Sequence, residues 1–117
     1  LTYGASLVAR GYSARANELA NLIVEAVRHK GFSFIHVHSP CTEFYNTYDY
    51  YDGLVTELPE DWDTSSLPAA IDLVLTEEKV HLGILYREDR AVYGIEARKF
   101  EKEIQTFDLT SYLQRFV

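Results

Sequence analysis

The chemical interest of this sequence centres on one thiol. Cys41 is the only cysteine among the 117 residues, and it lies in the loop Ser39-Pro40-Cys41, directly after a stretch with the pattern of a strand. A lone cysteine can be a small buried hydrophobe, a nucleophile or a metal ligand. A nucleophile needs a histidine base within reach, but side chains on the preceding strand usually point away from the loop beyond it. Chemistry at Cys41 therefore requires partner groups from elsewhere.

Two other groups of side chains could bind metal. His36 and His38 share one strand face, and together with Cys41 they could form a zinc site, although this motif is too short to identify one. Two half-exposed strand histidines are the competing interpretation. The acidic turn around Asp61 lacks the ligand spacing of a calcium loop, and a solvated turn explains it better.

Composition narrows the classes of partner. The formal net charge is −7 and the pI is about 5.0, which disfavours binding to a nucleic-acid backbone. The sequence has no apolar run long enough for a membrane span and no signal-peptide pattern, and one cysteine cannot form an internal disulfide. We therefore expect a cytoplasmic protein. Methionine is absent, so we expect either a natural split subunit or an excised piece of a longer chain.

The first half of the sequence predicts a β-α-β unit. Residues 5–12 and 32–38 are β-prone, and the segment between them has apolar residues at helical spacing. Ser13 is placed to cap this helix, and Gly31 follows its end. A β-α-β connection makes its two strands parallel, which puts the Cys41 loop at the carboxyl edge of the sheet, where α/β proteins bind ligands. The predicted fold class is α/β with a parallel-sheet β-α-β core.

The second half predicts shorter elements. Residues 47–54 suggest a tyrosine-rich helix capped by Thr47, and residues 66–75 a helix capped by Ser66. The pattern of residues 80–86 then indicates a strand, and residues 95–106 and the last apolar positions suggest helices of a tail.

Three segments resemble one known family. They are Ala5-Ser6-Leu7-Val8-Ala9-Arg10-Gly11-Tyr12, the run from His29-Lys30-Gly31-Phe32 into Ser39-Pro40-Cys41-Thr42, and Leu82-Gly83-Ile84-Leu85-Tyr86-Arg87-Glu88. In order and spacing they are similar to the carboxyl-terminal half of the thiamine-diphosphate-binding β subunit of 2-oxoacid:ferredoxin oxidoreductases, most of all the 2-oxoglutarate type. The resemblance implies that residues 1–89 are the carboxyl-terminal part of that subunit and that residues 90–117 form a helical tail.

The resemblance also implies a role for the thiol. In this family the cysteine of the Ser-Pro-Cys loop is the fourth ligand of a [4Fe-4S] cluster, which assigns Cys41 as the metal ligand. The other three ligands would lie outside this chain. Ser39 and Thr42 would be cofactor-binding residues that donate hydrogen bonds to cluster or thiolate sulfurs, with solvent-facing loop hydroxyls as the competing interpretation. No residue of the chain is expected to be catalytic.

The implied function is oxidative decarboxylation of 2-oxoglutarate to an acyl-CoA, with electrons passed through the cluster to ferredoxin. The cofactors would be the cluster, thiamine diphosphate and Mg²⁺, and the partners the rest of the β subunit, the α subunit, ferredoxin, the 2-oxoacid and coenzyme A. The family's Gly-Asp-Gly…Asn segment for the diphosphate is absent, so this chain alone is expected to be inactive. Two alternatives stay open: pyruvate or a branched 2-oxoacid as substrate, and a non-catalytic α/β binding or assembly module.

Overall fold

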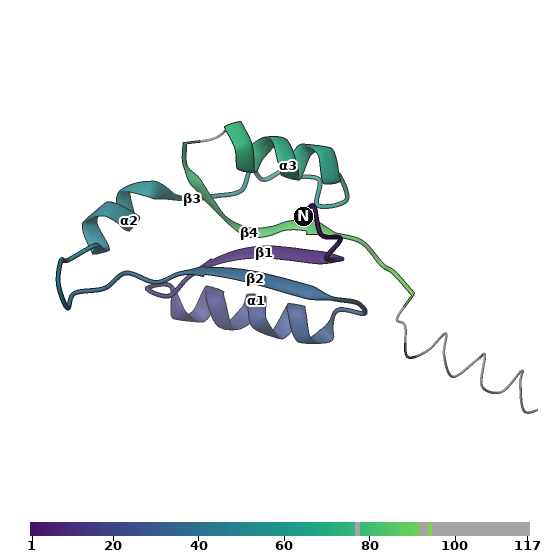
Figure 1. Ribbon diagram of the computed structural model, residues 1–117, viewed down its shortest axis with the longest axis horizontal. Helices are drawn as coiled ribbons and strands as arrows, with labels where there is room; N and C mark the ends of the chain where they lie inside the picture. The colour runs from purple at the N-terminus through teal and green to yellow at the C-terminus, as the bar shows by residue number, and fades with distance from the viewer. Residues whose placement is uncertain (77, 92–93, 95–117) are drawn as a thin grey trace, which may run out of the picture.

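The computed structural model describes residues 1–76, 78–91 and 94. In these residues four strands and three helices alternate along the chain (Figure 1): β1 (Leu7–Tyr12), α1 (Ala16–Arg28), β2 (Ser33–His38), α2 (Tyr48–Leu54), β3 (Val55–Glu57), α3 (Leu67–Thr76) and β4 (Val80–Arg87). The predicted helices of the tail fall outside the described residues. Within the described part no helix has the length and apolar character needed to cross a bilayer.

The sheet has the strand order β2-β1-β4-β3. β1 and β2 are parallel and joined by α1, which confirms the predicted β-α-β core. β3 and β4 are also parallel and are joined by α3, but β4 is antiparallel to β1. The sheet thus consists of two β-α-β units that run in opposite directions and meet along β1 and β4. α1 covers one face and α3 the other (Figure 1).

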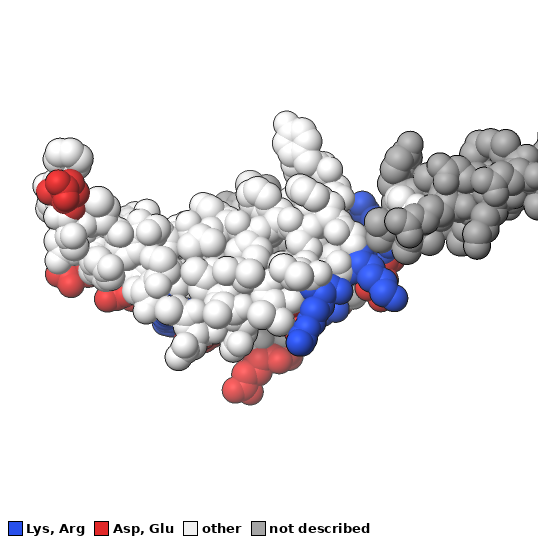
Figure 2. Space-filling model, turned by 90° about the horizontal axis from the view of Figure 1, so that it is seen from below, with Lys and Arg blue, Asp and Glu red and all other residues white. Residues whose placement is uncertain are grey.

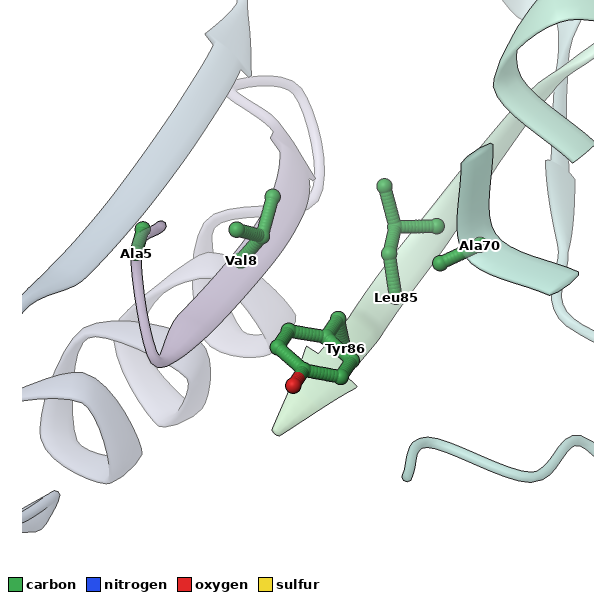
Figure 3. Close-up of a cluster of buried hydrophobic side chains, with 5 residues drawn as sticks. All are labelled: Ala5, Val8, Ala70, Leu85 and Tyr86. Atoms are coloured by element: carbon green, nitrogen blue, oxygen red, sulfur yellow. The ribbon is translucent and has the colours of Figure 1, made fainter. Parts of the chain in front are cut away.

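The centre of the core is the contact between α3 and the seam of β1 and β4. Its buried residues, drawn in Figure 3, are Ala5, Val8, Ala70, Leu85 and Tyr86. The register shifts within this seam, because Val8 pairs with Tyr86 whereas Ala9 pairs with Ile84. Leu85 is the extra residue of a β-bulge. Its carbonyl accepts a hydrogen bond of 3.0 Å from the indole N–H of Trp62, which satisfies a backbone group near the bulge.

Two of the three predicted helix caps are absent. Ser66 does cap α3, since its Oγ accepts a hydrogen bond of 3.3 Å from the Ala69 amide. Ser13 does not cap α1: the N-cap residue is Arg15, without a side-chain cap, and the Ser13 hydroxyl instead donates to the Ser39 hydroxyl. Thr47 is the N-cap residue of α2, but its hydroxyl bonds elsewhere. In both cases the hydroxyl forms a hydrogen bond with a residue that the tertiary fold brings close.

The turn from α1 into β2 is held by a buried polar contact. His29 Nε2 lies 2.9 Å from Ser6 Oγ, and Ser6 Oγ donates to the Phe32 carbonyl at 3.2 Å. Because a hydroxyl has only one hydrogen, His29 Nε2 must carry the proton that it shares with Ser6. Both residues are buried. The His29 ring therefore connects the end of α1 to the start of β1.

Gly31 lies against this contact. Its φ is +149°, in the region that favours glycine, and a Cβ there would come within 2.1 Å of Ser6 Oγ and 3.0 Å of His29 Nε2. Neither neighbour can move away without breaking the bond between them. Any side chain at position 31 is therefore excluded by both backbone conformation and space.

We expect Gly31→Ala to destabilise the chain by about 3 kcal/mol, since it combines backbone strain with overpacking of a buried contact. Thermal unfolding followed by circular dichroism measures the change. Gly53→Ala is the matched control, because Gly53 lies in α2 with nothing within 4 Å of the added carbon. Equal unfolding temperatures for the two variants would contradict the assignment of Gly31 as a packing constraint.

Candidate functional site

The Cys41 loop, residues 39–47, leaves the sheet where β2 ends. β1 and β2 are parallel, with Tyr12 paired to His38, so the carboxyl ends of both strands lie side by side at this edge. The Ser13 amide donates to the His38 carbonyl at 2.9 Å and extends the pairing by one residue. Pro40 then restricts the backbone directly before Cys41. The loop thus begins from a fixed point at the edge predicted to bind ligands.

Thr47 closes the loop around Cys41. The Cys41 amide donates to Thr47 Oγ1 at 2.9 Å, and the Thr47 amide donates to the Cys41 carbonyl at 3.1 Å. The Thr47 hydroxyl also lies 3.3 Å from that carbonyl. Both backbone polar groups of Cys41 are therefore bonded to one residue. Sequence analysis interpreted Thr47 only as a helix cap, because nothing in the local pattern shows that the chain folds back on itself.

The thiol of Cys41 is exposed and free. Its Sγ accepts a hydrogen bond from the Glu43 amide, with a nitrogen-to-sulfur distance of 3.5 Å. A backbone N–H is therefore directed at the sulfur. The loop therefore presents a sulfur that is accessible from outside the chain and has one preset donor.

The other two predicted site residues have different surroundings. Ser39 is exposed, and its hydroxyl accepts a hydrogen bond of 3.3 Å from Ser13, at the neighbouring strand end, rather than bonding to Cys41. Thr42 is exposed next to Cys41. The donor that does reach the sulfur is the Glu43 amide, which sequence reasoning missed because any residue supplies an amide.

Aromatic rings gather at the same edge of the sheet. The rings of His36 and His38 lie 4.3 Å apart, and Tyr51 of α2 contacts His38 at 5.7 Å and Tyr12 at 6.3 Å between ring centres. Burial, together with the charges of His36 and Arg10, holds the pKa of His38 below its usual value. The His38 imidazole is therefore neutral at neutral pH. Through Tyr51, α2 packs against the rings of Tyr12 and His38 beside the Cys41 loop.

A hydrogen bond attaches α2 to the end of β1. The Tyr12 hydroxyl donates to Asp52 at 2.7 Å. Burial, the bond to Asp52 and the negative charge of that carboxylate raise the pKa of Tyr12 to about 12. Tyr12 is therefore a donor throughout the physiological range. The contact fixes α2, and with it the end of the Cys41 loop, relative to the sheet.

The zinc alternative gains no support from this geometry. Across residues 1–76, 78–91 and 94, no three His, Cys, Asp or Glu side chains come close enough together to hold a metal ion. In the part of the chain that is described, Cys41 therefore has no neighbours that would complete a metal site. The acidic turn at 60–63 likewise provides no cation site; there Asp63 accepts bonds from the amide and hydroxyl of Ser65, which lower its pKa.

Comparison with protein families gives a match over residues 43–102, to the family described as the C-terminal region of the pyruvate ferredoxin oxidoreductase beta subunit. This is just over half of the sequence. The chain belongs to this family. The match begins two residues after Cys41, so it identifies the domain without bearing on the thiol.

Two individual relatives are consistent with this family. The chain is 31% identical over 103 residues to the 2-oxoacid:ferredoxin oxidoreductase subunit beta of Sulfolobus sp, covering 76% of this chain and 34% of the relative. It is 39% identical over 67 residues to the subunit of the same name from Saccharolobus solfataricus, covering 54% of this chain and 22% of the relative. The chain therefore spans about a third or less of the length of these two relatives.

A solved structure confirms the resemblance in three dimensions. It is the 2-oxoglutarate:ferredoxin oxidoreductase of Magnetococcus marinus with 2-oxoglutarate, coenzyme A and succinyl-CoA bound. The TM-score is 0.83 at 31% identity, covering 97% of this chain and 41% of the other. The predicted fold, that of part of an oxidoreductase β subunit, is thereby confirmed.

The bonds of Thr47 predict that this residue holds the Cys41 loop in place. Thr47→Val keeps the shape of the side chain but removes the acceptor of the Cys41 amide, at a cost of about 1 kcal/mol. We expect that amide to exchange its hydrogen about fivefold faster, as measured by NMR. Thr47→Ser retains the hydroxyl and should restore slow exchange. If Thr47→Val left the exchange rate unchanged, the loop would not depend on this residue.

Proposed function

We propose that the chain is the carboxyl-terminal part of the β subunit of a 2-oxoacid:ferredoxin oxidoreductase, and that Cys41 supplies one thiolate ligand to a [4Fe-4S] cluster. The observation that carries this proposal is the exposed sulfur of Cys41, on a restrained loop at the carboxyl edge of a domain of this family. Family membership gives the class of reaction, and the geometry of the loop supports the role of the residue.

The residues fit one corner of such a cluster. A [4Fe-4S] cluster is held by four cysteine thiolates, and this sequence has one cysteine. The exposed position of Cys41 leaves its sulfur accessible to iron and to ligands from another part of the protein. The Glu43 amide bonded to Sγ is of the kind that tunes the potential of iron–sulfur sites. Ser39 and Thr42 are adjacent hydroxyls that we propose as further donors to sulfur.

The chain does not fit thiamine diphosphate by itself. The cofactor supplies the decarboxylation chemistry when bound, and the sequence lacks the Gly-Asp-Gly…Asn segment that would hold its diphosphate. We propose that this chain provides one cluster ligand and part of the domain around the cofactor. We propose that the rest of the β subunit, the α subunit and ferredoxin are its partners, in the cytoplasm, with residues 1–89 as the domain part and 90–117 as the tail.

Replacement of Cys41 tests the ligand role directly. In the assembled enzyme, Cys41→Ser should lower iron content, visible absorbance and ferredoxin reduction together, because one corner of the cluster loses its sulfur. Tyr45→Phe, which keeps the aromatic ring of an exposed residue of the same loop, is the control that should keep iron content and absorbance. A Cys41→Ser enzyme with full absorbance and activity would refute the assignment. Circular dichroism separates this outcome from misfolding.

We further propose 2-oxoglutarate as the substrate, supported by the Magnetococcus marinus structure, which has 2-oxoglutarate and succinyl-CoA among its ligands. Pyruvate is the specific competitor, since the family carries its name. Ferredoxin reduction by the assembled enzyme should have its highest kcat/KM with 2-oxoglutarate when compared with pyruvate and a branched 2-oxoacid. A higher value for either competitor would overturn the substrate assignment and leave the enzyme class intact.

A further inference from the structure

A groove runs beside α3 on the face of the sheet that this helix covers (Figure 1). The helix packs over the seam of β1 and β4, so it leaves the side of β2 less covered. Apolar side chains from all three strands and the helix line the groove, among them Val8, Phe34, Leu85, Ile71 and Val74. Its volume is about 290 Å³. This is close to the lower limit of about 300 Å³ for pockets that hold small molecules.

Two polar side chains complete the lining of the groove on the strands. The register pairs Val8 with Phe34 and, two residues further along, Arg10 with His36. These four side chains lie on the same face of the sheet, since alternate residues of a strand point to the same side. Among the described residues that line the groove, none is Asp or Glu. The groove therefore combines an apolar body with a cationic group.

Arg10 is half-buried, and its charge is not neutralised within the described part of the chain. Arg15, Arg87 and Arg90 each form an ion pair with a glutamate, whereas Arg10 has no such partner there. Burial lowers the pKa of Arg10, but a guanidinium stays charged at physiological pH. Because a partly buried charge without a partner costs free energy, an anion at this position would be stabilising.

The surroundings of Arg10 strengthen the attraction for an anion. The rings of His36 and His38 lie 4.3 Å apart, and His38 Nε2 is buried without a hydrogen-bond partner among the described residues. The positive charges of His36 and Arg10 contribute to the low pKa of His38, and no carboxylate offsets them. The chain thus has a locally positive site although its net charge is −7.

The opposite face of the sheet has the reverse character. Figure 2 views the molecule from the side of α1 and shows a broad central area in which the described residues present no Lys or Arg. The hollow on that face is lined by Glu18, Glu25 and Glu57. An anionic ligand would therefore be attracted to the α3 face and not to the α1 face.

We propose that the groove binds a small monocarboxylic acid with an apolar body, whose carboxylate pairs with Arg10 and His36. The planar guanidinium donates two parallel hydrogen bonds to a carboxylate, and one arginine suits one such group. The apolar side chains along β1, β2 and α3 then contact the aliphatic or aromatic body of the acid. This inference goes beyond the proposed function and does not depend on the role of Cys41.

Titration calorimetry with octanoate on the complete β subunit tests the proposal, with octan-1-ol as the control ligand. Both have the same chain length, but only octanoate has a carboxylate. We expect saturable binding of octanoate, about tenfold tighter than binding of octan-1-ol, because hydrogen bonds between charged groups are stronger than neutral ones. Absence of octanoate binding would overturn the proposal, and so would equal affinity for the two ligands.

A substitution of the arginine tests which residue binds the carboxylate. Arg10→Met keeps an apolar stem and removes the guanidinium, so the affinity of the subunit for octanoate should fall about tenfold while that for octan-1-ol stays the same. Arg28→Met is the matched control, since Arg28 is an exposed arginine at the end of α1. An equal loss of octanoate affinity in the two variants would contradict the assignment of Arg10.

A second pair of variants tests the groove without altering Arg10. Leu75 lines the groove and is 78% exposed, so Leu75→Glu leaves the core intact and places a carboxylate beside the ligand. We expect octanoate to bind about tenfold more weakly, through repulsion and lost apolar contact. Thr76→Glu adds the same charge at the next residue and should change the affinity less than about twofold. Equal effects of the two glutamates would show that the acid does not bind in this groove.

Discussion

The parallel pairing of β1 with β2 is the constraint on which the rest of the described structure depends. At its start the pair is anchored by the buried contact of Ser6 with His29 and by the carbonyl of Phe32. At its end it is extended by the bond from Ser13 to His38. Because both ends are anchored, the direction and position of the chain leaving β2 are determined before the Cys41 loop begins. An error at Gly31 would therefore displace the site at the far end of the strand.

The restraint of the Cys41 loop comes in two parts with different physical origins. Its start is fixed by the sheet and by the proline, whereas its end is fixed by Thr47 and by the attachment of α2 through Tyr12 and Asp52. A rigid loop loses little conformational entropy when its thiolate binds a metal. An exposed sulfur on such a loop is suited to a cluster shared between separate segments, since each segment has to present its ligand in place.

Local pattern was sufficient to predict the elements of the β-α-β core, because strand alternation, helical spacing and the glycine after α1 are all encoded within a few residues. The antiparallel pairing of β1 with β4 was not predictable in this way, since it depends on how two units, each with apolar faces, meet. The predicted side-chain caps at Ser13 and Thr47 are absent for a related reason. A hydroxyl can bond to several nearby groups, and the tertiary fold brings Ser39 close to Ser13 and the Cys41 backbone close to Thr47. The interest of Cys41 itself came from resemblance to a family rather than from its chemistry.

The position of Cys41 determines what the proposed cluster role would require of the rest of the protein. No second ligand lies near Cys41 among the described residues, so in that role the other ligands come from elsewhere. The pairing of β1 with β2 fixes where the Cys41 loop leaves the sheet, and the bonds of Thr47 fix the backbone of Cys41. In the proposed cluster, the sheet would therefore set the position of Cys41 relative to the remaining ligands.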